Sequence, residues 1–506
     1  MSNQRYIEVR NGSPAIPVGE IPVLSYDLFH EEVCGLLKSE ANHCLSYHCV
    51  DLQSVYRFFC FIADDAAGTI RILSHEMKKD GAPLRSLTEV IPSMHIFERE
   101  IHESHGIGFT GHPWLKPVRY SHDRADRSSA MDNYPFYEIE SEELHEVGVG
   151  PIHAGVIEPG HFRFICNGEK VLHLEIQLGY QHRGTEKLMA EKEGALQRCI
   201  IAENIAGDTA AGHGLAHAQL IESLASVEPD EALQIERCIA LEMERIAVHI
   251  GDTAALCGDV AYQLGQVTCE ALRTMVINTT QLWCGNRFSK GLMRPGGTNY
   301  PLTEEISGEI LKIMAEVEKR FSDVTGLIYT LPSVLGRMED IGTVTRQQAA
   351  ETGALGMAAR TCGIMRDIRK THPFQYFRKY EITPVIQEQG DVLARGTLRA
   401  QEVKESVKII RHLLHEWKET RGTAKKPVYD YRLQPESLAI SVTEGWRGEI
   451  CHIALTDSSG KIIHYKIKDP SVHNWMSLAL AVRNQEISDF PVCNKSFNLS
   501  YCGHDL

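Results

Sequence analysis

The sequence contains no pair of cysteines separated by two residues, although it has 14 cysteines among its 506 residues. Scattered thiols in a cytosolic chain are mostly buried as small hydrophobic residues. Zinc ribbons and cysteine-ligated iron–sulfur sites instead need closely spaced cysteine pairs. The spacing therefore disfavours a self-contained zinc or iron–sulfur site within this chain.

Long apolar runs and an excess of positive charge are also lacking. No window holds 18 uninterrupted apolar residues, so we expect no membrane span. Lys and Arg number 52 against 67 Asp and Glu, a net charge of -15, so we expect no nucleic-acid partner. The first residues lack the basic-then-apolar layout of a secretion signal. We therefore expect a cytoplasmic protein that other subunits could hold at a membrane surface.

The composition is otherwise that of a globular protein, with 43% hydrophobic residues and a length compatible with about two to four domains. Apolar runs at Tyr56–Ala63 and Thr69–Leu73, with a helical stretch around Met94–Ser104, predict a small α+β domain. Few large apolar residues occur from Tyr120 to Glu146, which predicts a linker.

The remainder of the chain predicts a larger, mainly helical domain. The runs Gly160–Cys166 and Lys170–Leu178 predict a hairpin around the turn Asn167-Gly168. Apolar spacing predicts helices within 186–282 and at 303–325, 346–360, 399–420 and 471–482, strands within 438–467, and a non-periodic end. We therefore expect an α+β protein in three parts: a small α+β domain (1–119), a linker (120–146), and a helical bundle domain with peripheral β-strands (147–506).

Two charged residues stand beside turns. Glu158, in GVGPIHAGVIEPGHFRFI (148–165), precedes Pro159-Gly160 and a predicted strand. Burial would raise its pKa and suit it to relaying protons, whereas the alternative is an ordinary solvated turn acid. Arg183, in YQHRGTEK (180–187), opens a helix whose first turn carries Glu186, which is typical of an ordinary capping arrangement.

Two pairs of residues are spaced to share a helical face. Arg245 and His249 lie four apart in an otherwise apolar helix, so they must be paired or serve a site, the alternative being a satisfied core histidine. His213 and His217 have the same spacing, but Gly214 stands where a zinc hydrolase carries its catalytic Glu, which disfavours a metal site. Short charged segments marked by Gly or Pro are typical of loops that line an interior seam; they lie at 293–297, 362–373, 391–399 and 443–449.

Together these motifs resemble one superfamily: the large subunits of membrane-bound [NiFe] hydrogenases and the homologous catalytic core subunit of respiratory complex I. HIFEREIHESHGIGFTGHP (95–113) resembles the signature of complex I's small core subunit, which is fused to the large one in formate hydrogenlyase. The large-subunit motifs follow in the family's order: GPIHAGVIEPGHFRF, HRGTEK, ERIAVHIGDTAALC, RPGG, DIGTVT, CGIMRDIRKTHP and TEGWRGE. The resemblance covers about residue 25 to the end and implies a hydrogenase large-subunit-like fold, with formate hydrogenlyase as the nearest branch.

The chain departs from the hydrogenase pattern at the metal. Hydrogenases hold nickel and iron with four thiolates from two C-x-x-C pairs, because soft metals need such sulfur donors. With His213 as the anchor of the first pair, the four ligand positions are occupied by residues without sulfur: Ala206, Thr209, Ser500 and Gly503. Cys502 is one residue out of register, whereas Asp505 matches the family's terminal Asp. We therefore expect no nickel–iron centre and no hydrogen chemistry.

Complex I has lost the same ligands and uses the cavity for quinone, whose head group meets a Tyr and a His. The resemblance places Glu203 at the Tyr position and no histidine at the His position, because His153 matches an earlier family His. It therefore does not support quinone reduction by the same residues. A quinone-reducing NADH dehydrogenase subunit, with quinone and NAD binding, stays an alternative.

Electron entry is the property that the resemblance retains. Family members receive electrons from an iron–sulfur cluster in a small partner subunit, close to an Arg and a His that correspond to Arg183 and His249. A nearby cation raises a cluster's potential, and a histidine can couple protonation to reduction. Glu158 matches the family's Glu at the proton exit. Buried Arg/Asp pairs are candidates for passing a charge shift toward the membrane arm: Asp367, Arg369, Asp391 and Arg395.

The leading hypothesis is a core subunit of a multisubunit oxidoreductase, peripheral on the inner face of the cell membrane and inactive in isolation. It binds no cofactor directly. The expected partners are a small subunit with a 4Fe-4S cluster, a ferredoxin-like subunit, and antiporter-like and other membrane subunits. The candidate site residues are Glu158, Arg183, His249, His153, Glu203 and Asp505. The alternatives are a non-redox structural subunit between the iron–sulfur and membrane arms, and a hydrogenase with unusual ligands.

Overall fold

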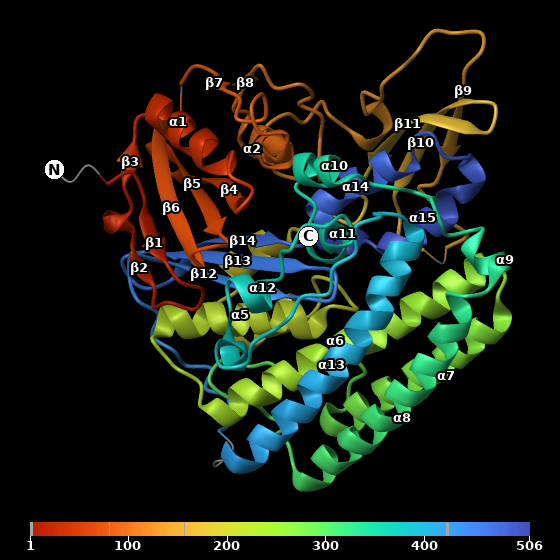
Figure 1. Ribbon diagram of the computed structural model, residues 1–506. Coiled ribbons are helices and arrows are strands. Elements are labelled where there is room, and N and C mark those ends of the chain that lie inside the picture. The colour runs from red at the N-terminus through yellow and green to blue at the C-terminus, as the bar shows by residue number, and fades with distance from the viewer. Residues whose placement is uncertain (1–3, 80, 156, 421–424) are drawn as a thin grey trace.

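The computed structural model describes residues 4–79, 81–155, 157–420 and 425–506. Residue 156, within the motif around Glu158, lies outside this description. Figure 1 shows an N-terminal sheet covered by helices, a group of long helices, and a projecting β-arm. The expected α+β class is confirmed. Within the described residues, no helix combines the length and the apolar character needed to cross a bilayer.

The N-terminal domain is a sheet with strand order β1-β6-β5-β4, and β3 pairs with β6 in parallel. Its strands are β1 (Ile7–Val9), β3 (Val23–Leu24), β4 (Asn42–Leu52), β5 (Val55–Asp64) and β6 (Thr69–Lys78). Its helices are α1 (Tyr26–Leu37) and α2 (His95–His105), and a short parallel pair joins β7 (Leu84–Arg85) to β8 (Phe109–Thr110). The predicted strand and helix runs of this domain are thereby confirmed.

The run YRFFCFIA explains how this sheet is held against the rest of the chain. Side chains alternate across a strand, so β5 sends its residues to two different cores. Phe58 and Ile62 pack with α1 and α2, whereas Phe59 and Phe61 belong to the large core that includes the helical domain. All four are fully buried. A strand buried on both faces reads as a continuous apolar run rather than as an alternating one.

The second part is built on long helices, with α6 packed against both α7 and α13 (Figure 1). The long helices are α5 (Ala210–Ala225), α6 (Glu231–Asp259), α7 (Gln263–Cys284), α8 (Glu304–Ile328) and α13 (Val392–Thr420). The short helices are α3 (Thr185–Glu191), α4 (Ala195–Ala202), α9 (Pro332–Leu335), α10 (Arg346–Thr352), α11 (Gly356–Arg360) and α12 (Ile368–Thr371). The single helix predicted at 346–360 is therefore two helices, interrupted at Gly353, whose φ of 69° ends α10.

Two further sheets flank the helices. The projecting β-arm has the order β11-β10-β9, with β9 (His145–Val149), β10 (His161–Asn167) and β11 (Lys170–Gln177). The predicted hairpin is confirmed, including its turn at Asn167-Gly168. The other sheet has the order β14-β13-β12-β2, with β2 (Ile16–Pro17), β12 (Ser437–Glu444), β13 (Glu449–Thr456) and β14 (Ile462–Lys468). Residues 120–144 contain one 3-10 turn, Met131–Asn133, and otherwise irregular backbone.

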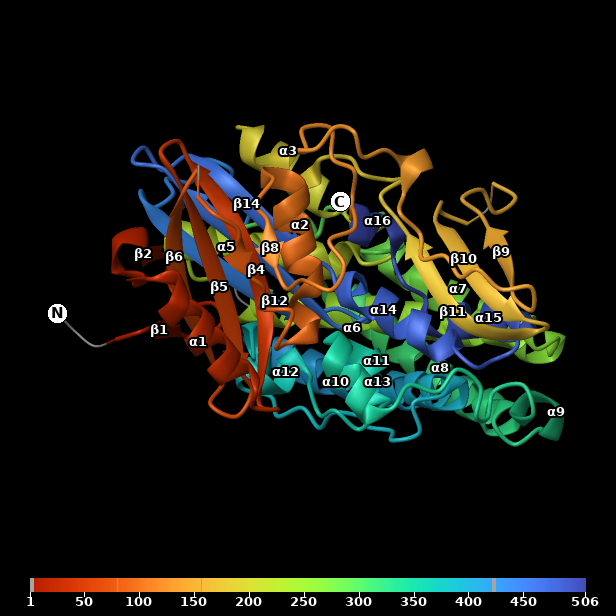
Figure 2. The same cartoon turned by 90° about the horizontal axis from the view of Figure 1, so that it is seen from above.

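The C-terminal end is helical rather than irregular. Helix α14 (Ser471–Val482) matches its prediction, but α15 (Phe490–Phe497) and α16 (Tyr501–Asp505) were expected to be non-periodic. Helices of eight and five residues are too short to show apolar periodicity. Local signals specify them instead, because Pro491 begins α15 and the Ser500 side chain caps α16. Figure 2 shows α16 near the centre of the molecule.

The N-terminal segment is fastened to the C-terminal sheet by Asn11. Its side-chain amide donates to the carbonyls of His372 (2.9 Å) and Val442 (2.7 Å), and its oxygen accepts from the Val442 amide (3.0 Å). Asn11 is buried, so all three bonds are shielded from water. They hold the N-terminal segment to β12.

We predict that Asn11→Ala destabilises the folded chain by about 2–4 kcal/mol, because three buried hydrogen bonds are lost and their partners stay unpaired. Thermal denaturation should show a lower Tm. Asn133→Ala is the matched control, since Asn133 is exposed and bonds only to neighbouring residues. Equal Tm values for the two variants would contradict this role of Asn11.

Candidate functional site

The C-terminal helix α16 is tied to the segment that carries Arg183. Asp505 is fully buried and accepts hydrogen bonds from the backbone amides of Gly179 (2.8 Å) and Gln181 (2.9 Å). The backbone amide of Arg183 donates to the carbonyl of Leu506 at 2.9 Å. Asp505 therefore fixes the position from which the Arg183 side chain extends.

The Arg183 side chain joins two segments that are distant in the sequence. Its guanidinium donates to the carbonyls of Asn204 (2.6 Å), Ile205 (2.9 Å) and Cys502 (3.0 Å). One segment directly precedes Ala206 and the other directly precedes Gly503, so the guanidinium lies over the junction of the two. Arg183 is itself exposed.

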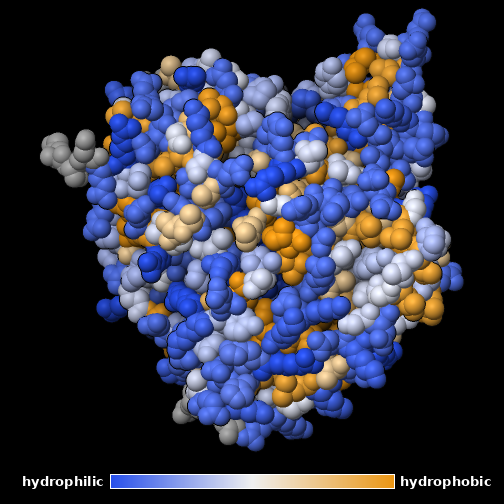
Figure 3. Space-filling view, viewed as in Figure 1, coloured by the Kyte–Doolittle hydropathy of each residue, from blue (hydrophilic) through white to orange (hydrophobic). Residues whose placement is uncertain are grey.

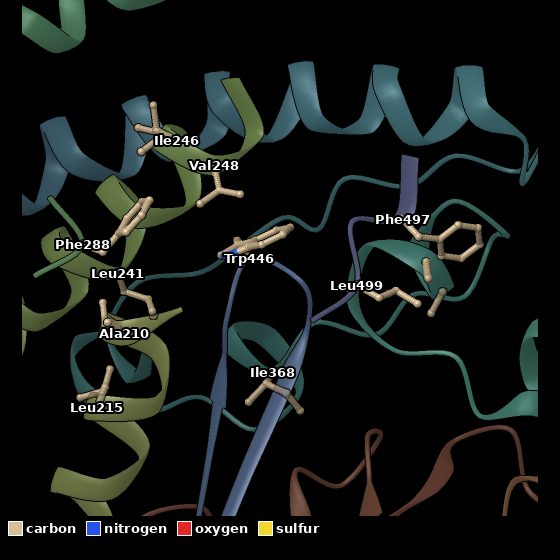
Figure 4. Close-up of a cluster of buried hydrophobic side chains, with 14 of the residues drawn as sticks. Ala210, Leu215, Leu241, Ile246, Val248, Phe288, Ile368, Trp446, Phe497 and Leu499 are labelled. Atoms are coloured by element: carbon tan, nitrogen blue, oxygen red, sulfur yellow. The ribbon is translucent and has the colours of Figure 1, made fainter. Parts of the chain in front are cut away.

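A second guanidinium joins the same two segments on the buried side. Arg447 donates to both oxygens of Asp208 (2.7 and 2.8 Å), to Thr209 Oγ1 (3.0 Å) and to the Asn498 carbonyl (2.6 Å). It also stacks on the Trp446 ring at 3.9 Å. Figure 4 shows Trp446 at the tip of the β12–β13 hairpin, among buried side chains of α5 and α6.

The four positions Ala206, Thr209, Ser500 and Gly503 therefore lie around one locus. Ser500 Oγ is occupied by the Gly503 amide, which donates to it at 2.9 Å. A Cβ added at Gly503 would lie 2.7 Å from Asp469 Cγ and 2.9 Å from Ser500 Oγ. Asp469 in turn bonds His213 Nε2 at 3.0 Å. Asp469 and Ser500 crowd the position of Gly503, and none of the four residues offers a thiolate.

Glu158 lies at the edge of this locus. The pKa of the neighbouring Cys502 thiol is raised to about 11 by burial and by the Glu158 carboxylate. Glu158 is only half-buried, in the loop between β9 and β10. His153 lies in the same loop, where its Nε2 bonds the Gly160 carbonyl at 2.9 Å. Glu158 is thus placed beside α16, while His153 holds the loop closed.

Glu203 directly follows α4 and is engaged in a buried ion pair. Its Oε1 accepts from Arg294 Nη1 at 2.6 Å and from the Gly291 amide at 2.8 Å, and its Oε2 accepts from Arg294 Nη2 at 3.3 Å. Arg294 belongs to the MRPGG segment predicted to line an interior seam. Both oxygens of Glu203 are therefore used within the chain.

His249 is fully buried and bonds Glu402 Oε2 at 2.7 Å. Burial lowers the pKa of His249 despite this carboxylate. Arg245, on the same helical face, also contacts Glu402 (3.4 Å). Arg245 and His249 therefore share Glu402 as their partner. The side chains of His249 and Arg183 share no hydrogen-bond partner, because His249 bonds the buried Glu402 whereas Arg183 bonds three backbone carbonyls.

Glu402 is the centre of a buried network of charges. Burial opposes its charge, but Arg360 at 2.7 Å and the bond from His249 hold the pKa of this carboxyl well below its usual range. Arg360 also contacts Glu444 at 2.8 Å. The network continues through Arg369, which pairs with Asp367 (2.7 Å) and Glu242 (2.9 Å).

Only one of the two expected Arg/Asp pairs is present. Asp367 and Arg369 form an ion pair, but Asp391 accepts from the amides of Asp340 and Ala394. Arg395 donates to Ser496 and to the carbonyls of Gly342 and Gly390 instead. The spacing of four residues allowed the second pair, but backbone groups satisfy Asp391, and the Ser496 hydroxyl and two carbonyls satisfy Arg395.

The histidines of α5 do not converge on a common point. His213 bonds His452 (3.1 Å) and Asp469, whereas His217 bonds the Tyr465 hydroxyl at 3.0 Å. Burial lowers the pKa of His217 to about 3, so it is neutral. Among the residues that the structure describes, no group of three His, Cys, Asp or Glu side chains could hold a metal ion.

Two known protein families match separate parts of this chain. The family described as "Respiratory-chain NADH dehydrogenase, 49 Kd subunit" matches residues 259–505, and that of the 30 Kd subunit matches residues 29–127. Both halves of a fused complex I subunit are therefore represented in one chain. These matches fit the superfamily of complex I core subunits and membrane-bound hydrogenases.

Its curated relatives include members of both branches. The chain is 24% identical to hydrogenase-4 component G of Escherichia coli, over 83% of this chain and 76% of that protein. It is 25% identical to formate hydrogenlyase subunit 5 of the same organism, over 82% and 76%. It is 24% identical to an NADH-quinone oxidoreductase subunit of Phocaeicola vulgatus, over 79% and 82%.

Several residues of the candidate site were not predicted from the sequence. Asp208 stands between two of the four ligand positions and pairs with Arg447, which lies in the quoted TEGWRGE motif. The motif was a usable signal for Arg447. Glu402 and Asp469 carry no comparable signal, because each is an isolated acid whose partners come from other elements.

Glu244, on α6, caps the N-terminus of α5 beside this locus. Its carboxyl accepts from the amides of Ala211 (2.7 Å) and Gly212 (3.3 Å). Such amides lack partners within the helix. Burial raises the pKa of Glu244 from 4.5 to about 8. Between these two pKa values, Glu244 keeps its proton in the folded chain but has released it in the unfolded chain. The free energy of unfolding therefore falls as pH rises through this range.

We predict that Glu244→Gln flattens the pH dependence of stability, since Glu244 contributes a slope of up to about 1.4 kcal/mol per pH unit. The Tm difference between variant and parent should shift in the variant's favour from about pH 5 to pH 8. Glu305→Gln, at an exposed position, is the control and should follow the parent. Parallel curves for Glu244→Gln and the parent would show that Glu244 does not titrate there.

Proposed function

We propose that the chain is the core subunit of a complex I-like, hydrogenase-related oxidoreductase that holds no nickel–iron centre of its own. It accepts electrons from a 4Fe-4S cluster in a partner subunit and takes part in coupling this redox step to ion translocation in membrane partners. Ferredoxin or NADH is oxidised elsewhere in the complex. The observation that carries the proposal is the placement of Arg183.

Arg183 is a fixed and exposed cation. Its three bonds go to uncharged backbone carbonyls, and no carboxylate of the described residues forms an ion pair with it. Exposed apolar residues lie to either side: Ile200 on α4, whose carbonyl bonds Asn204, and Ile157 beside Glu158. Apolar surface around a functional group is typical of a subunit interface. A cation at such an interface stabilises the reduced form of a nearby cluster.

The four ligand positions support the absence of a metal centre. They offer no thiolate, the Ser500 and Thr209 hydroxyls are bonded within the chain, and a side chain at Gly503 would collide with Asp469. Glu203, at the position of the quinone-contacting Tyr, has both oxygens occupied by Arg294 and Gly291. These observations favour electron entry and coupling over hydrogen or quinone chemistry by these residues.

We predict that Arg183→Met lowers the midpoint potential of the partner's cluster by tens of millivolts in the purified complex, because the cation no longer stabilises the reduced state. A redox titration followed by electron paramagnetic resonance measures this. Arg183→Lys should restore most of the potential, and Arg320→Met, an exposed substitution on α8, should leave it unchanged.

The same titration separates the proposal from a purely structural role. A scaffold that only joins two arms would give an intact complex with an unchanged potential in Arg183→Met. That result would contradict electron entry at this site.

A further inference from the structure

A cavity of about 660 Å³ lies where the N-terminal domain meets the rest of the chain. Its walls come from α2, from the segment 113–118 that follows β8, from β11 and from α14. Figure 2 shows α2, α14 and β11 following one another across this seam. The volume falls within the range of small-molecule sites in proteins.

The inner wall is mainly apolar and aromatic. It contains Ile96, Trp114, Tyr134, Leu174, Trp475 and Ala479. Figure 3 shows one face of the molecule, which is predominantly hydrophilic with separate apolar patches. Flat, rigid aromatic walls of this kind suit a ligand with an apolar body.

The polar groups of the wall carry a surplus of positive charge. Arg99, Lys116 and Arg483 line the cavity, against the single carboxylate of Glu175. Lys116 pairs with that carboxylate. Arg99 donates to two backbone carbonyls, and Arg483 is exposed at the rim. A local surplus of cations in a chain of net charge -15 favours a negatively charged ligand.

Two buried side chains of the wall have polar atoms with no partner among the described residues. Both ring nitrogens of His95 and Nε1 of Trp475 are unbonded there, although each residue is only 4% exposed. Burial holds the pKa of His95 well below its usual range, so its ring is neutral. Buried polar groups without a partner are rare in proteins, and a bound ligand would satisfy them.

We propose that this cavity binds an amphipathic organic anion: a small molecule with an aromatic or acyl body and one acidic group. The body lies between Trp114 and Trp475, and the acidic group faces Arg99 and Arg483. The proposal is independent of electron entry at Arg183, because it concerns other elements.

Calorimetric titration of the full chain with 1-naphthoate tests this inference, with neutral 1-naphthalenemethanol as the uncharged counterpart. We expect one saturable site for naphthoate and binding about fivefold weaker for the alcohol, since a partly exposed ion pair contributes at most about 1 kcal/mol. Decanoate distinguishes the two sources of such an anion: tighter binding of decanoate indicates an acyl ligand, and tighter binding of naphthoate an aromatic one.

Two matched variants locate the site. Arg483→Met should weaken naphthoate binding about fivefold and leave the alcohol unaffected. Arg432→Met removes the same charge from another cavity of about 660 Å³ and should change the binding of neither compound.

Ala479→Trp should fill the cavity and abolish binding at an unchanged Tm. If this variant fails to fold, the comparison of the two arginine variants tests the proposal. Absence of saturable binding by both anions, or equal losses in the two arginine variants, would overturn the proposal.

Discussion

The Arg447 guanidinium holds together the two chain segments on which the candidate site depends. It donates hydrogen bonds to the side chains of Asp208 and Thr209, which precede α5, and to the Asn498 carbonyl, which precedes α16. Charge-assisted, bidentate bonds of this kind are strong and directional. Here a guanidinium and a carboxylate join the two segments. On the exposed side, Arg183 also bonds carbonyls of both segments.

Behind this junction the charges are buried and mutually compensated. Glu402 receives His249, Arg245 and Arg360, while Arg369 links Asp367 to Glu242. Removing one member of such a network leaves another charge buried and unpaired, which costs several kcal/mol. The network therefore fixes the relative positions of α6, α11, α12 and α13.

Much of the fold was predictable because long elements carry strong periodicity. The hairpin at Asn167-Gly168 and helix α14 were predicted closely, whereas α15 and α16 are too short to reveal themselves. The site divides in the same way. Family motifs singled out Arg183, His249 and Asp505. The structure ties Asp505 to the segment of Arg183 but places His249 beside Arg245 in the network of Glu402. The Asp208–Arg447 pair and the central role of Glu402 arise only from tertiary packing, which no local pattern encodes.

We propose that protein groups occupy the place that a nickel–iron centre would take. The most direct measurement is the nickel content of the complex purified without oxygen from cells grown with nickel, compared with a nickel-containing hydrogenase prepared in the same way. We expect nickel far below one atom per chain, with iron accounted for by iron–sulfur clusters. One nickel atom per chain would contradict it.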